Sequence, residues 1–246
     1  MRKRDLLLST IGLLVFWQLA ALIISKAVLP APHEVLRAFV LALPQELGIH
    51  MLVSAWRVAA SIGLAIVCAV PIGLSLGLSP TANRLAAPLI YLLYPIPKIV
   101  FLPIILLLLG IGNLSKIVVI SLVLFFQMLV VVRDEASSLR PELIASVRSL
   151  GAGRKALFRY VYLPACLPAV LTSLRVSIGT AVAVLFFAES FATTSGLGYY
   201  IIIETWGRLD YAGMYAGVVA MSLLGLVLYF AVDSIQQRMC PWLEAN

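Results

Sequence analysis

The stretch PELIASVRSLGAGRKALFRYVYLPACLP, from Pro141 to Pro168, is the longest segment of this chain that lacks the composition of a membrane span. It carries one acidic side chain, Glu142, and four basic ones: Arg148, Arg154, Lys155 and Arg159. Long apolar segments precede and follow it. Basic loops between apolar spans stay on the cytoplasmic side of a membrane. The stretch therefore predicts a cytoplasmic insert whose surface binds a soluble partner.

The composition of the whole chain indicates an all-α polytopic membrane protein. Its 246 residues are 62% hydrophobic and 12% charged, and the mean hydropathy is +1.06. Soluble domains are about 25% charged, so this chain is too apolar to solvate its own surface. The net charge of +7 is carried by loops, where basic residues set topology and bind anionic lipid rather than nucleic acid. The three cysteines form no CxxC pair and are expected to be idle thiols.

Six apolar segments are predicted to span the membrane within a single domain covering residues 1–246. They lie at about 6–25, 51–78, 85–109, 117–132, 166–188 and 211–235. The first is expected to be an uncleaved helix, because it is longer than the core of a signal peptide. Of the 18 basic residues, five fall in predicted outer segments or close to the outer ends of spans: Lys26, Arg37, Arg57, Lys116 and Arg208. Two more, Lys98 and Arg175, lie within spans. The other eleven fall inside, which predicts that both termini are cytoplasmic.

The third predicted span contains YPIPKIVFLP, from Tyr94 to Pro103. Three prolines in one span are incompatible with an unbroken helix. Broken backbone at membrane depth is tolerated where protein buries it or where it lines a cavity. Lys98 lies at this break, where it either attracts an anionic solute or pairs with a carbonyl group of the broken helix.

Three other polar side chains within or at the ends of spans are candidates for a solute pathway. Tyr94 either lines the pathway or packs, and Gln127 either contacts the solute or bridges two helices. Glu189 ends the fifth span, where it either pairs with a basic group or acts as a gate. The sequence shows no Ser/His/Asp set, paired carboxylates or metal-ligand spacing, so no catalytic, cofactor or metal residue is predicted.

The insert itself is predicted to form two helices joined by a glycine turn, outside the membrane and within residues 133–164. Pro141 suits the first turn of a helix, and Glu142 meets the positive end of its dipole. Leu143, Val147 and Leu150 recur at helical spacing. Gly151 interrupts this helix, and a second helix from about Arg154 is expected to stop at Leu163-Pro164.

The spacing within the insert resembles the cytoplasmic "EAA" loop of ABC importer permeases: Glu-Ala-Ala, three residues, Gly, nine residues, Ile-x-Leu-Pro. Gly151 and Leu163-Pro164 match this pattern, whereas Ala145-Ser146-Val147 replaces the Glu-Ala-Ala triplet. Glu142, one turn earlier, is expected to take over the acidic contact. Four other stretches are similar to permeases of the nitrate, sulfonate and taurine group: LPAPHEVL at 29–36, YPIPKIVFLPIILLLLGIGNLSK at 94–116, AES at 188–190 and GLGYYI at 196–201.

This resemblance implies the type I ABC importer permease fold, with six helices and a cytoplasmic coupling helix. It implies a homodimer in the bacterial inner membrane that works with two ATPase subunits and a periplasmic or lipid-anchored binding protein. The cargo it suggests first is an alkanesulfonate, taurine or a similar anion. ATP and Mg²⁺ belong to the ATPase, since this chain has no GxxxxGK[ST] loop and is expected to bind no cofactor.

The resemblance also assigns the residues expected to contact the ATPase: Glu142, Ala145, Ser146, Val147, Arg148, Gly151, Ala152, Leu163 and Pro164. The residues expected along the solute pathway, from their polar side chains within or at the ends of spans, are Tyr94, Lys98, Gln127 and Glu189. The alternatives are an ABC permease for a vitamin precursor, nitrate or bicarbonate, an ion-driven secondary transporter, and a scaffold protein without transport. A secondary transporter predicts acidic residues deep in the spans and repeated halves, neither of which is seen in this sequence.

Overall fold

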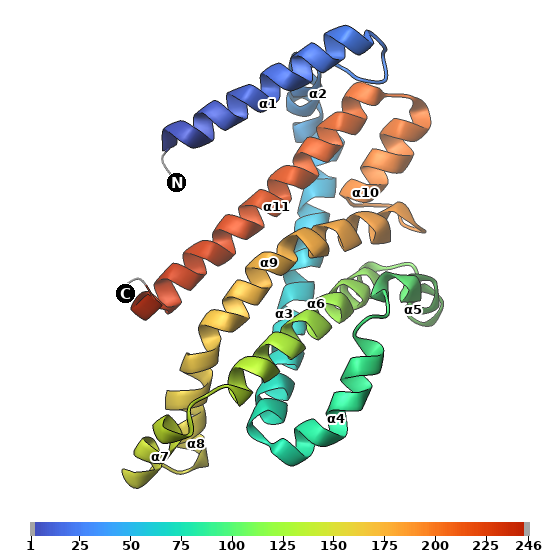
Figure 1. The fold of residues 1–246 in the computed structure, drawn as a ribbon. Helices are drawn as coiled ribbons and strands as arrows, with labels where there is room; N and C mark the ends of the chain where they lie inside the picture. Colours follow the sequence, from blue (N-terminus) through green and yellow to red (C-terminus); the bar gives the residue numbers. More distant parts are fainter. Residues whose placement is uncertain (1–2, 244–246) are drawn as a thin grey trace. The chain divides into compact units, whose positions relative to one another are not determined.

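The structure is a computed structural model that describes residues 3–243, and within this range it is built from helices and turns. The α-helices are α1 (Lys3–Ile24), α2 (Pro32–Ala42), α3 (Gly48–Leu78), α4 (Pro80–Leu93), α5 (Leu102–Leu109), α6 (Asn113–Ser137), α7 (Pro141–Ser149), α8 (Arg154–Leu157), α9 (Leu163–Ser190), α10 (Leu197–Tyr199) and α11 (Tyr211–Met239) (Figure 1). Short 3₁₀ or π turns occupy Leu43–Leu47, Lys98–Phe101, Phe158–Tyr162, Tyr200–Thr205, Trp206–Arg208 and Pro241–Leu243. The predicted cytoplasmic ends, Met1-Arg2 and residues 244–246, lie outside the described residues.

The described helices confirm an all-α protein with several membrane-spanning segments. Four helical segments are long and apolar enough to cross a bilayer, at Pro32–Leu78, Asn113–Ser137, Lys155–Ser190 and Tyr211–Met239. A bent pair, Pro80–Leu93 with Lys98–Leu109, adds a fifth if it is counted as one span. The segment Leu8–Ile24 of α1 is a shorter apolar helix that is not counted among these spans. The count of six spans therefore stays a prediction.

The proline-rich third span is broken, as the sequence predicts. Its two halves differ in direction by 80° (Figure 1). Two polar stretches beside it have the composition of turns but are largely helical. In Ser79–Arg84, the Ser79 hydroxyl caps α4 by accepting from Ala82 N–H at 3.3 Å, and Pro80 suits the first turn of the helix. In Gly110–Lys116, the turn ends at Gly112, since α6 begins at Asn113.

The predicted insert forms the helix α7, a turn and the helix α8. Gly151 ends α7 with a φ of +84°, and its N–H donates to Arg148 O at 2.9 Å. A φ in this range favours glycine, which explains the residue at this turn. The predicted stop at Leu163-Pro164 is wrong. The Leu163 N–H donates to Phe158 O, five residues back, so a π turn leads α8 into α9 without a break.

The chain falls into two compact units. The first unit combines the described residues up to Ala55 with Glu189–Leu224, and the second combines Trp56–Ala188 with the described residues from Gly225 on. The three helices α3, α9 and α11 each contribute to both units. The prediction of a single domain stays a prediction.

Small residues allow α3 and α6 to pack closely in the second unit, as expected for membrane helices. A Cβ atom on Gly73 would lie 2.8 Å from Val132 Cβ, and one on Gly77 would lie 2.5 Å from Ala136 Cβ. Gly63, also expected at a helix contact, has no atom within 4 Å of such a Cβ. Of these three glycines, only Gly73 and Gly77, in the C-terminal half of α3, allow close packing against α6.

The polar groups of α9 and α11 also meet within the second unit. The guanidinium of Arg175 pairs with Asp233 at 2.5 Å and lies 6.0 Å from the centre of the Tyr229 ring. Gln236 Nε2 donates to Thr172 Oγ1 at 3.0 Å. These contacts give Arg175 a packing role between two helices.

Candidate functional site

The helix α7 lies on the surface of the described part of the chain. None of its residues is buried, and Leu143 and Leu150 are 41% and 86% exposed. Figure 1 shows α7 and α8 at the tip of the second unit, beyond the end of α6. Apolar side chains exposed on a short helix commonly mark a surface that a partner covers.

The structure places most of the predicted ATPase-contacting residues on α7 and its glycine turn. Among them Glu142, Ala145, Ser146, Arg148 and Gly151 are exposed, and Val147 and Ala152 are half-buried. Leu163 and Pro164 lie apart from this helix, in the first turn of α9.

Ala145-Ser146-Val147, which stands in place of Glu-Ala-Ala, changes the side chains that α7 exposes. Ser146 Oγ donates to Glu142 O at 2.8 Å, and Ser149 Oγ donates to Ser146 O at 2.8 Å. Both hydroxyls are therefore engaged by the backbone of the helix. The exposed Glu142 is the acidic residue of α7, in its first turn.

Lys98 binds the backbone at the break of the third span. Its Nζ donates to Leu93 O at 2.8 Å and to Tyr94 O at 2.6 Å, and lies 4.4 Å from the centre of the Phe126 ring. Carbonyl groups at the C-terminus of a helix lack intrahelical partners and attract cations. Of the two expected roles of Lys98, the contacts match pairing with carbonyl groups of the broken helix.

Two of the predicted pathway residues, Tyr94 and Gln127, line one cavity of about 630 Å³ in the second unit. We call this cavity the α6–α9 pocket. Its walls are Tyr94, Gln127, Val131, Glu135, Pro168, Ala169, Thr172, Ser173, Val176, Ser177 and Thr180. Lys98 is not among them, and Glu189 belongs to the first unit.

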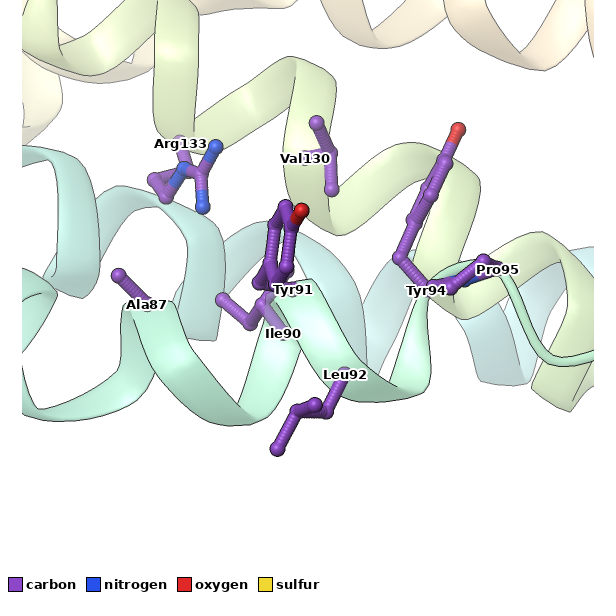
Figure 2. A pocket seen from close by; sticks show the side chains of 8 residues that line it. All are labelled: Ala87, Ile90, Tyr91, Leu92, Tyr94, Pro95, Val130 and Arg133. Carbon is purple, nitrogen blue, oxygen red and sulfur yellow. The ribbon is translucent and has the colours of Figure 1, made fainter.

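A second cavity, of about 690 Å³, lies between α4 and α6 in the same unit. Figure 2 shows Tyr91 and Tyr94 projecting from the α4 side toward α6, which carries Val130 and Arg133. The guanidinium of Arg133 pairs with Asp134 at 2.7 Å. Since Tyr94 also lines the α6–α9 pocket, this tyrosine belongs to both cavities.

In the first unit, Glu189 is fully buried and holds the turn that follows Ser195. The Ser54 hydroxyl donates to Glu189 Oε2 at 2.7 Å, and the Gly198 N–H donates to the same oxygen at 3.1 Å. Ser54 Oγ in turn accepts from Leu197 N–H at 2.8 Å. Hydrogen bonds from several donors stabilise a buried carboxylate, so these contacts fix the turn against α3.

His50 completes this cluster. Its Nδ1 accepts from Gly196 N–H at 2.9 Å, which places the ring proton on Nε2. Nε2 lies 3.1 Å from Glu204 Oε2, a contact that lacks hydrogen-bond geometry. Gly196 has a φ of +114°, and a Cβ on it would overlap the Glu189 carboxyl group. Only glycine fits there, which accounts for the first glycine of GLGYYI.

The sequence analysis missed His50 and Ser54 as partners of this turn. Their contacts join residues 146 and 143 positions apart, and the one local signal is the glycine of the turn. Tyr200, in the same GLGYYI stretch, is also buried: it is 5% exposed, and its ring centre lies 5.7 Å from that of His50. Burial, together with Asp210, Glu204 and Glu46, raises the pKa of Tyr200 to about 12.

Comparisons with known proteins agree on one family. Residues 61–241 match the model of the binding-protein-dependent transport system inner membrane component. The chain is 32% identical to the taurine transport system permease protein TauC of Escherichia coli (strain K12), over 98% of this chain and 90% of that protein. It is 26% identical to the putative aliphatic sulfonates transport permease protein SsuC of the same strain, over 94% and 89%.

Solved structures show the same fold. The MetNI methionine ABC transporter in an inward-facing conformation aligns with a TM-score of 0.64 at 20% identity, over 77% of this chain and 94% of that chain. A bacterial ABC transporter for the import of alginate aligns with a TM-score of 0.60 at 17% identity, over 96% of each. This chain therefore belongs to the family of binding-protein-dependent transport system inner membrane components, the permease subunits of ABC importers.

Proposed function

We propose that this chain forms the membrane pathway of an ATP-driven importer for a small organosulfonate, with an alkanesulfonate or taurine as the first candidate. The observation that carries the proposal is the relationship to TauC, which extends over 98% of this chain at 32% identity. The similarity to SsuC, named for aliphatic sulfonates, supports the same solute class.

In this proposal α7 and its glycine turn dock on a separate ATPase subunit. The support is the apolar surface of α7, which the described residues leave exposed at Leu143 and Leu150. Glu142 supplies the acidic contact in place of the Glu-Ala-Ala triplet. When ATP closes the ATPase dimer, the docked helices move together and switch the pathway from inward-facing to outward-facing, a rigid-body change. Since α8 continues into α9, this movement reaches the pathway through continuous helix.

The proposed assembly contains two copies of this permease, two ATPase subunits and a periplasmic or lipid-anchored binding protein. It resides in the bacterial inner membrane with both permease termini in the cytoplasm. The binding protein selects the solute, and ATP and Mg²⁺ bind to the ATPase subunits. This chain contributes no catalytic residue to ATP hydrolysis.

The proposed pathway uses the candidate residues differently. Tyr94 and Gln127 line the α6–α9 pocket and contact the solute. Lys98 holds the broken third span through its carbonyl contacts. Glu189 holds the turn at Gly196–Gly198 at the outer end of the pathway. This turn responds when the binding protein docks.

Replacing Leu150 with aspartate tests the docking surface. We expect this exposed apolar residue to lie against the ATPase, so Leu150→Asp should lower ATPase copurification at least tenfold, because it buries an unpaired charge. Ser149→Asp adds the same charge off the apolar stripe of α7 and is the matched control. Equal copurification of wild type and Leu150→Asp from membranes with equal permease content would refute docking through α7.

A further inference from the structure

The α6–α9 pocket is lined by hydroxyl groups that the protein's own hydrogen bonds do not use. Ser173, Ser177 and Thr180 line it at helical spacing on one face of α9. Ser173 and Ser177 are 8% and 5% exposed as whole residues. Among the described residues, neither hydroxyl makes a hydrogen bond, and neither oxygen is one of the fully buried unpaired atoms, so both are open to the cavity. Buried serines in helices ordinarily donate to the carbonyl four residues back, as Ser61 does to Arg57 O at 2.7 Å. The pocket therefore holds spare hydrogen-bond donors.

Two more polar groups of the pocket fit a polar occupant. Gln127 Oε1 is buried without a hydrogen-bond partner in the described part of the chain. Thr172 Oγ1 accepts from Gln236 Nε2, so its own proton stays available for donation. Buried polar groups are ordinarily paired. The oxygen atoms of a solute would accept from the hydroxyl groups left open here, and an N–H group of the solute would donate to Gln127 Oε1.

The charge of the pocket is unusual for a site that would hold a simple anion. Glu135 is the charged residue among its lining residues, and the described chain offers this carboxylate no ion-pair partner. The two basic residues of the predicted spans are engaged elsewhere, Lys98 with carbonyl groups and Arg175 with Asp233. A carboxylate without a neighbouring cation repels an anion and attracts an ammonium group.

We infer that the α6–α9 pocket binds small solutes that carry both an oxyanion and an ammonium group. The hydroxyl groups of α9 hydrogen-bond the oxyanion, and Glu135 selects the ammonium group. This inference rests on the proposed function and narrows it, because it favours zwitterionic solutes over anions of the same size. Neutral donors bind an oxyanion more weakly than a basic side chain does, which suits a site that a solute must leave.

Thiol labelling tests the charge preference in the purified complex of permease and ATPase. Cys68, Cys166 and Cys240 are the cysteines of the chain and are first replaced with alanine. Ser177→Cys is then treated with two methanethiosulfonates of similar size, one with a trimethylammonium group and one with a sulfonate. After correction for their rates with a free thiol, we expect the cationic reagent to react at least tenfold faster. Adding Glu135→Gln should bring the ratio close to one.

Protection by two probes tests the zwitterion directly. Taurine and isethionate share the sulfonate and differ by an ammonium group in place of a hydroxyl group. Taurine should slow labelling of Ser177→Cys at lower concentration than isethionate, and Glu135→Gln should remove the difference. Ser25→Cys, at the exposed position directly after α1, is the control, and its labelling should respond to neither probe.

Several results would overturn the inference. They are equal rates for the two reagents, faster labelling by the sulfonate reagent, a ratio that Glu135→Gln leaves unchanged, and equal protection by taurine and isethionate. Absence of labelling at both Ser177→Cys and Thr180→Cys would show that the pocket holds no water-filled path, and would also overturn it. ATP-driven import is measured separately, so a complex that imports nothing but keeps the charge preference would contradict the proposed function alone.

Discussion

Gly196→Ala should prevent the first unit from holding its native structure. The new Cβ would overlap the Glu189 carboxyl group, and φ at this residue is +114°. Relieving the overlap moves the turn away from α3 and breaks its hydrogen bonds to Ser54 and His50. Backbone strain and a buried carboxylate that loses donors together cost on the order of 3–5 kcal/mol. This is a large part of the 5–15 kcal/mol that stabilises a typical domain.

The measurement is thermal unfolding of the purified protein in detergent, followed by tryptophan fluorescence. Gly12→Ala is the matched control, because Gly12 lies in α1 of the same unit and a Cβ there meets no atom within 4 Å. Alanine favours a helix over glycine, so the control should unfold at or above the wild-type temperature. A Gly196→Ala protein that accumulates and unfolds like wild type would show that the Glu189 cluster does not hold this turn.

Gly151→Val should uncouple the permease from its ATPase while leaving the fold intact. Gly151 has a φ of +84°, and no atom lies within 4 Å of a Cβ built there. The Cβ of valine therefore meets open space, but valine cannot adopt this φ without a cost of roughly 1–2 kcal/mol. The turn after α7 relaxes to another shape, and the docking surface loses its geometry. We expect solute-stimulated ATP hydrolysis to fall about tenfold at unchanged thermal stability.

Gly153→Val tests whether the effect comes from the backbone conformation of the turn or from the added side-chain volume. Gly153 belongs to the same turn and also has open space around it, but its φ is not positive. This variant should retain most of the stimulated ATP hydrolysis. Equal activity of the two variants, whether both active or both inactive, would contradict a coupling role for the backbone shape at Gly151.

The sequence predicts those features that depend on one residue and its neighbours. Pro141 begins α7 and Gly151 ends it, as expected from the preferences of proline and glycine at helix ends. The proline cluster at Tyr94–Pro103 breaks the third span. The absence of a side chain at Gly73 and Gly77 allows α6 to pack closely against α3. Each of these follows from local backbone geometry or from the absence of a side chain.

Other features depend on contacts that local patterns do not carry. The buried Glu189 meets Ser54 across 135 residues, and neither residue has a distinctive neighbourhood. Leu163-Pro164 resembles a helix stop, but the π turn before it supplies an alternative hydrogen bond, so the helix continues. In the sequence, Ser173 and Ser177 look like ordinary small residues of a membrane span. Only the structure shows that they line a cavity.

The most direct test of the central claim is import into proteoliposomes that contain this permease and its ATPase. The binding protein is supplied outside with radiolabelled taurine, ATP is enclosed inside, and ionophores collapse all ion gradients. An ATP-driven importer should accumulate taurine under these conditions and stop when ATP is replaced by a non-hydrolysable analogue. Accumulation that ionophores abolish, and that proceeds without ATP or the ATPase, would identify an ion-driven secondary transporter and contradict this account.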